Sequence, residues 1–148
     1  MALRREAVLA LANARQLLDA GNGTDGKEAA LQANRLSPDL IPAAILAAEM
    51  QTNDNSKRAA TKIIKKAWEA TPHPDLAASF AEIEPDETPA KRVKRFNVLV
   101  KLHPEHSESK MLQAELMLVA EDFPGARRAI GTLAESEPTA RSLTIMAA

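Results

Sequence analysis

Small and apolar residues recur every three or four positions along most of this 148-residue chain, a pattern typical of amphipathic helices. Turn-forming residues interrupt the pattern at Gly21-Asn22-Gly23, at Asn53-Asp54-Asn55, and at Asp122. The sequence therefore predicts an all-α fold. The expected helices span residues 3–20, 25–36, 39–52, 56–70, 74–83, 89–102, 106–121 and 124–136.

Four prolines divide the chain at a nearly constant interval. Pro38, Pro72, Pro104 and Pro138 each follow a helical stretch, and they lie 34, 32 and 34 residues apart. Proline cannot continue a helix, but its fixed φ suits the start of the next one. A period of 34 residues is typical of repeats that each consist of two antiparallel helices.

The residues between the prolines align when each repeat is numbered so that its proline is position 32. Positions 8 and 20, where the paired helices come closest, are small, and positions 24 and 27 are apolar. The small pairs are Ala14 and Gly26, Ala48 and Ala60, and Ala114 and Ala126; the apolar set is Ala30, Ala33, Ile64, Ala67, Ile130 and Leu133.

This arrangement resembles the tetratricopeptide (TPR) family. The resemblance implies one domain over residues 1–148, folded as a right-handed solenoid of about four antiparallel helix pairs and the start of a fifth. The expected repeats are 7–40, 41–74, 75–106 and 107–140, with a partial repeat at 141–148.

The third repeat is two residues short and departs from the pattern. Arg92 falls at position 20, where a small residue is expected, although Phe96 and Leu99 fit positions 24 and 27. Thr88 is a suitable N-cap before Pro89. We expect a degenerate but helical repeat, preceded by a solvated acidic turn that contains Glu82, Glu84, Asp86 and Glu87 and lacks the pattern of a calcium loop.

The last residues begin a fifth repeat with no polar capping helix after it. Solenoids need capped ends because a terminal face is otherwise apolar. We therefore expect a soluble piece of a longer protein. Leu143, Ile145 and Met146 would lack cover, and self-association through this end could supply it.

Composition excludes several function classes. A net charge of −1 gives no global field for nucleic acid, and the absence of cysteine excludes disulfides and thiolate chemistry. His103 and His106 have a spacing that metal ligands use, but both lie in a turn between repeats, where polar residues are expected. Without a phosphate loop or a Ser-His-Asp arrangement, we expect no enzyme, metal or cofactor.

The concave face of such a solenoid is its default binding surface. Apolar residues at position 5 (Leu11, Ile45 and Met111) disfavour a clamp for the carboxylate tail of a chaperone and favour a helix or hydrophobic peptide. Part of this surface could equally be ordinary core between repeats. The candidate groove residues are Leu11, Arg15, Leu18, Ile45, Glu49, Thr52, Met111, Glu115 and Leu118.

Two second helices of the repeats are basic. We expect them on the convex face, either as a solvated surface or as a site for an acidic partner or anionic lipid; the lack of aromatic residues disfavours nucleic acid. The candidate residues are Lys62, Lys65, Lys66, Lys91, Lys94 and Arg95.

Three segments resemble the C-terminal TPR region of the proteobacterial HemY family: His73-Pro74-Asp75-Leu76, the stretch from Glu87 to Arg95, and Leu102-His103-Pro104-Glu105-His106. The resemblance implies a parent protein anchored in the inner membrane by two N-terminal helices, with this region on the cytoplasmic side. It implies a non-catalytic scaffold that organises late haem or tetrapyrrole enzymes. No catalytic residues carry over from the family.

Two alternatives remain at this point. The first is a carrier that binds haem or another tetrapyrrole directly, with Met111, Met117 and His103 or His106 as ligands. The second is a general TPR adaptor whose basic convex face binds acidic partners or lipids.

Overall fold

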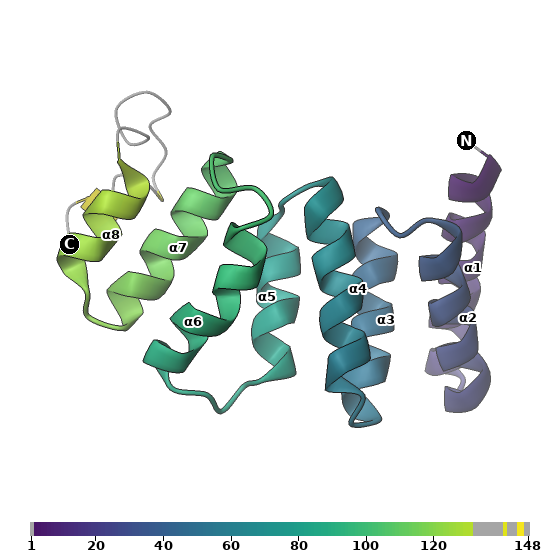
Figure 1. Ribbon diagram of the computed structural model, residues 1–148. Helices are drawn as coiled ribbons and strands as arrows, with labels where there is room; N and C mark the ends of the chain where they lie inside the picture. Colours follow the sequence, from purple (N-terminus) through teal and green to yellow (C-terminus); the bar gives the residue numbers. More distant parts are fainter. Residues whose placement is uncertain (1, 132–140, 142–144, 147–148) are drawn as a thin grey trace. The chain divides into compact units, whose positions relative to one another are not determined.

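The computed structural model describes residues 2–131, 141, 145 and 146. Eight α-helices and no strand are present in that part of the chain (Figure 1), so the all-α prediction is confirmed. Most predicted boundaries agree within two residues; residues 132–136 of the last predicted helix lie outside the described part. The helices are α1 (Ala2–Asp19), α2 (Gly23–Leu36), α3 (Ile41–Asn53), α4 (Lys57–Ala70), α5 (Pro74–Ile83), α6 (Pro89–Val100), α7 (Ser107–Val119) and α8 (Phe123–Ile130).

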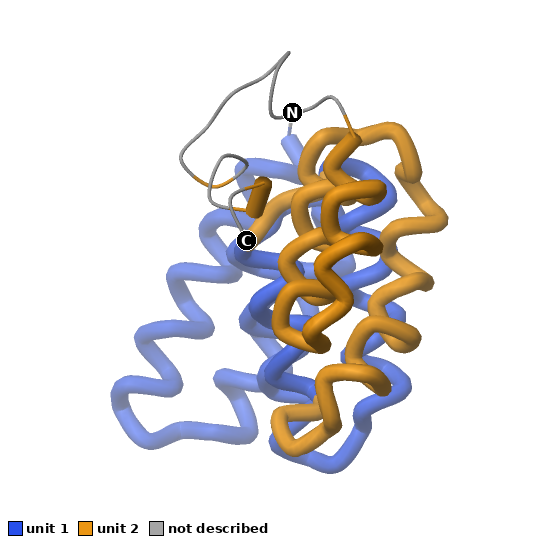
Figure 2. The backbone as a smooth tube through the Cα atoms, turned by 90° about the vertical axis from the view of Figure 1, so that its left-hand side faces the viewer, with its two compact units in different colours: residues 1–71, 75–83 blue, residues 72–74, 84–148 orange. Residues whose placement is uncertain are grey.

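The chain divides into two compact units, shown in different colours in Figure 2. One unit comprises Met1–Thr71 and Asp75–Ile83, and the other comprises Pro72–Pro74 and Glu84–Ala148. The main division therefore falls within the third repeat, after α5 and before α6. The prediction of one continuous repeat domain stays a prediction.

Three helix pairs, α1/α2, α3/α4 and α7/α8, share one turn geometry. Gly21, Asn55 and Glu121 occupy the same position in the proline register, and all have positive φ, at 79°, 61° and 63°. In each turn this residue's N–H bonds to the carbonyl three residues earlier at 3.0–3.1 Å, and the next N–H bonds five residues back at 2.8–2.9 Å. This left-handed helix ending satisfies the last carbonyls of the first helix. The backbone therefore repeats where the sequence does.

The small residues at positions 8 and 20 are buried, as predicted. Ala14, Ala60, Ala114 and Ala126 are fully buried, Ala48 is 1% exposed, and Gly26 is also buried. A Cβ added to Gly26 would lie 2.7 Å from side-chain carbons of Leu18 in α1, a distance that real Cβ atoms do not show. Small side chains thus permit the close approach of the paired helices.

Each unit contains its own apolar cluster. In the first, Ala7 and Leu11 of α1 pack with Ala33, Leu40 and Ala43. In the second, Met111, Ala114, Ala126, Ile130 and Ile145 pack together, with Met117, Leu118 and Ala129 against them.

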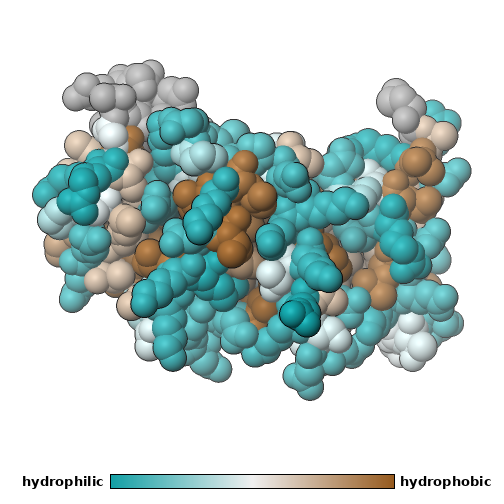
Figure 3. All heavy atoms as spheres, viewed as in Figure 1, coloured by the Kyte–Doolittle hydropathy of each residue, from teal (hydrophilic) through white to brown (hydrophobic). Residues whose placement is uncertain are grey.

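The expectation that Ile145 lacks cover is wrong. Its side chain is only 1% exposed because it packs into the cluster of its own unit. Met146 is 37% exposed, and Leu143 lies outside the described residues. Other exposed apolar side chains include Leu3 and Leu9 of α1. Figure 3 shows hydrophobic atoms on the surface among hydrophilic ones.

Candidate functional site: a groove between first helices

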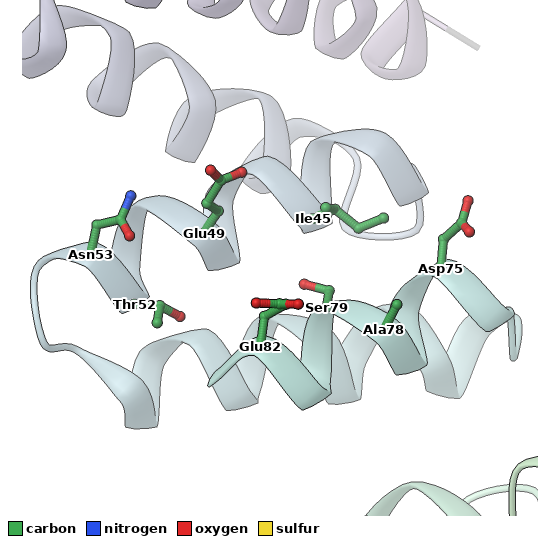
Figure 4. Close-up of a pocket in the computed structure, with 8 residues that line it drawn as sticks. All are labelled: Ile45, Glu49, Thr52, Asn53, Asp75, Ala78, Ser79 and Glu82. Carbon is green, nitrogen blue, oxygen red and sulfur yellow. The ribbon is translucent and has the colours of Figure 1, made fainter. Parts of the chain in front are cut away.

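A groove of about 560 Å³ lies between α3 and α5, both within the first unit. Figure 4 shows its two walls and the side chains that line them. Three of the predicted groove residues, Ile45, Glu49 and Thr52, are among them. The lining residues are Ile45, Glu49, Thr52, Asn53, Asp75, Ala78, Ser79 and Glu82.

Each wall is one face of one helix. The α3 residues are spaced at i, i+4, i+7 and i+8, and the α5 residues at i, i+3, i+4 and i+7. Both spacings place side chains on the same side of an α-helix. In Figure 4, Thr52, Ser79 and Glu82 lie between the two ribbons. The sequence interpretation missed the α5 wall, although its helical spacing was readable from the sequence.

A second, shallower groove adjoins the first. It has a volume of about 360 Å³ and shares Ile45, Glu49 and Asp75 with its neighbour. Arg15 of α1, another predicted groove residue, lines it. The two grooves therefore form a continuous surface over α1, α3 and α5 of the first unit, which we call the unit-1 groove.

The unit-1 groove combines apolar side chains with exposed carboxylates. Ile45 is half-buried, whereas Ala78, Glu49 and Glu82 are exposed. Within the described residues, the side chains of Glu49 and Glu82 have no hydrogen bond or ion pair. Arg15 is the only cationic side chain among the residues that line the two adjoining grooves.

The remaining predicted groove residues have other surroundings. Leu11 is 5% exposed and Met111 is 9% exposed, and each packs into the apolar cluster of its unit. Leu118 packs against the second cluster, while Glu115 forms an ion pair with Arg141. Leu11 and Met111 are therefore core residues and not groove residues, which is the second of the two interpretations offered for this surface.

The predicted basic residues lie in two different units. Lys62 and Lys66 of α4 are exposed and Lys65 is half-buried; Lys91 and Lys94 of α6 are exposed. Arg95 is held within its own unit, because its guanidinium forms an ion pair with Glu87 at 2.6 Å. Its charge is thus already balanced by a carboxylate of the same chain.

Glu87 corrects the prediction of a wholly solvated acidic turn. Its side chain is 10% exposed and accepts hydrogen bonds from Arg95 and from Arg92 Nε, the latter at 2.9 Å. Arg92 also donates to the Glu84 carbonyl at 2.7 Å. Hydrogen bonds from Arg95 hold the pKa of the Glu87 carboxyl below its ordinary value, against desolvation, which raises that pKa.

The predicted cap of α6 is confirmed, and α7 has a histidine cap. Thr88 Oγ1 accepts from the Lys91 N–H at 3.3 Å, and Pro89 begins the helix. His106 Nδ1 accepts from the Glu108 N–H at 3.0 Å, so this nitrogen is occupied. The His103 and His106 ring centroids are 6.3 Å apart. Among the described residues, no group of three or more His, Cys, Asp or Glu side chains could hold a metal ion.

Comparison with known proteins leaves the family open. No family model matches the chain, no curated protein matches it, and no solved structure matches it. In the described part, none of the helices has the length and apolar character needed to cross a bilayer.

Proposed function

We propose that this chain is a non-catalytic TPR-type scaffold that binds a protein partner in the unit-1 groove. The observation that carries the proposal is the groove of about 560 Å³ between α3 and α5, lined by Ile45, Glu49 and Thr52. Concave surfaces built from repeated helices are well suited to hold an extended or helical segment of another protein.

Two independent regularities support TPR-type repeats. The prolines and small residues recur at about 34 positions in the sequence, and the left-handed turn recurs at Gly21, Asn55 and Glu121 in the backbone. A right-handed solenoid of about four helix pairs is the proposed arrangement.

A narrower proposal places the parent protein in the HemY family, at the bacterial inner membrane, as an organiser of late haem or tetrapyrrole enzymes. Its support is the resemblance of the three segments around His73, Glu87 and His103. In this proposal the groove holds a pathway enzyme, and this region lies on the cytoplasmic side.

The test compares partners captured by the chain and by a variant with a filled groove. Ala78→Trp places a large side chain on an exposed position of the α5 wall. Ala90→Trp, at an exposed position of α6 in the other unit, is the matched control. We expect haem-pathway enzymes from native membranes to be captured by the wild type and by Ala90→Trp, and to be lost with Ala78→Trp. An identical protein set on all three would contradict the groove, and a specific set without haem enzymes would contradict the HemY proposal.

A further inference from the structure

The unit-1 groove carries information about the charge of its partner. Glu49 lies on the α3 wall and Glu82 on the α5 wall, and in Figure 4 the Glu82 carboxylate lies between the two ribbons. Both are exposed, and neither has a partner among the described residues. Asp75 adds a third carboxylate, which lines both adjoining grooves.

Some carboxylates elsewhere in the described part of the chain are matched by cations. Glu87 pairs with Arg92 and Arg95, and Asp39 pairs with Arg4 at 3.2 Å. The lining of the two adjoining grooves contains three carboxylates, Glu49, Asp75 and Glu82, and one cation, Arg15, which lines only the shallower part. The deeper part is therefore a negatively charged surface with apolar contacts from Ile45 and Ala78.

We propose that the unit-1 groove selects a positively charged peptide segment of a partner protein. Lys or Arg side chains of the segment would pair with Glu49 and Glu82, and an adjacent apolar side chain would contact Ile45 and Ala78. This proposal rests on the proposed protein-binding function and adds the chemistry of the partner. An acidic segment would place like charges together, which opposes binding.

The expected contribution of each carboxylate is modest. Exposed ion pairs are weak individually and are screened by salt, so the two glutamates together should change the affinity about five- to tenfold. Charge reversal at both positions should have a larger effect because it replaces attraction by repulsion. Binding of the basic segment should also weaken as ionic strength rises.

The experiment measures fluorescence anisotropy of three labelled 12-residue peptides. The first contains Lys, Arg and Leu; the second replaces every Lys and Arg with Glu; the third replaces them with Gln. Each is titrated with the whole chain, with the Glu49→Gln, Glu82→Gln double variant, and with the corresponding double Lys variant. The control, Glu6→Gln with Glu28→Gln, removes the same charge from exposed positions of the same unit outside the unit-1 groove.

We expect saturable binding of the basic peptide alone, a loss of about five- to tenfold in the double Gln variant, abolition in the double Lys variant, and little change in the control. If the control loses as much affinity for the basic peptide as the double Gln variant does, the effect comes from the net charge of the chain and not from the groove, and the proposal is overturned. Preference for the acidic or neutral peptide, abolished by Ala78→Trp, would overturn the charge selection while leaving the protein-binding function intact.

A second copy of the chain is the competing occupant, since α4 presents exposed Lys62 and Lys66. Sedimentation velocity of the wild type and the double Lys variant decides this point. If the wild type forms a concentration-dependent dimer that the variant abolishes, and the basic peptide does not bind, then the occupant of the groove is a second copy of the chain and the peptide proposal is overturned. If no peptide binds, Ala78→Trp captures the same proteins as the wild type, and the chain stays monomeric, the protein-binding function fails as well.

Discussion

The three regular helix pairs and the third repeat solve the same problem in different ways. The regular pairs use three-residue connections in which one backbone residue adopts positive φ, and their helices meet at buried small residues. The third repeat has a five-residue connection, 84–88, with no positive φ. Side chains stabilise this connection instead: Arg92 and Arg95 of α6 bind Glu87, and Arg92 also binds the Glu84 carbonyl.

This difference explains the irregular residue at position 20. In the regular repeats a long side chain there would disturb the close helix contact, whereas Arg92 extends to the preceding connection and satisfies a backbone carbonyl. Where the regular repeats have a close contact between small side chains, the third repeat has an ion pair and a hydrogen bond made by Arg92. This difference makes its stability depend on charge, while the regular pairs depend on volume.

The largest expected effect is at Glu87. Glu87→Gln removes the carboxylate that Arg92 and Arg95 share, and we expect unfolding in urea to show a loss of about 3 kcal/mol, the lower end for breaking a buried pair. Asp86→Asn, at an exposed neighbour, should change stability by less than about 0.5 kcal/mol. If Glu87→Gln is as stable as the wild type, the third repeat does not depend on the ion pairs of Glu87.

Next is the volume of a regular pair. Ala126 is fully buried, so Ala126→Leu should overpack its helix contact and reduce the free energy of unfolding by about 1–3 kcal/mol. Ala90→Leu, at an exposed position of α6, adds the same atoms without a steric conflict and should be nearly neutral. A neutral Ala126→Leu would show that small residues are not required in the regular pairs.

Acid should affect the two kinds of repeat unequally. The pKa of Glu87 is lowered in the folded chain, so its stabilisation is complete above the ordinary value of 4.5 and is lost as the pH falls through the lower folded value. Urea unfolding below pH 4.5 should therefore narrow the stability difference between wild type and Glu87→Gln. A difference that stays constant down to pH 2 would exclude the charge of Glu87 as its cause.

The smallest expected effect is a gain in stability. Glu121 adopts φ of 63°, which costs a residue with a Cβ about 1 kcal/mol relative to glycine. Glu121→Gly should therefore raise the free energy of unfolding by about 0.5–1 kcal/mol in thermal or urea unfolding. Asp86→Gly serves as the control because Asp86 does not have positive φ. A similar gain in stability in this control would show that the gain at position 121 does not come from the positive φ of the turn.

Much of the fold was predictable because local signals agreed. Proline spacing, the turn residues and the Thr88 cap are sequence features with direct backbone consequences, and the helices follow them. The positive φ at Glu121 was not predictable from that residue, since glutamate has no preference for it. The signal lay in its alignment with Gly21 and Asn55, two residue types that favour positive φ.

The candidate site was predictable on one wall only. Ile45, Glu49 and Thr52 followed from the repeat register, but the α5 wall lies in the irregular repeat, where the register gave no guide. Leu11 and Met111 entered the same prediction because a register position does not distinguish groove from core. The ion pair of Glu87 also depends on its side chain, in the 84–88 connection, meeting the long side chain of Arg95 in α6, which sequence spacing alone does not specify.

The division of the chain after Ile83 has a consequence for how the molecule can be dissected. The second repeat, as defined by the proline spacing, ends at residue 74. The groove, however, has one wall from the second repeat and the other wall from the third. The groove therefore extends one helix, α5, beyond the repeat border that the sequence period defines. A truncation designed at repeat borders would discard half of the groove, whereas one that ends after α5 would retain both walls.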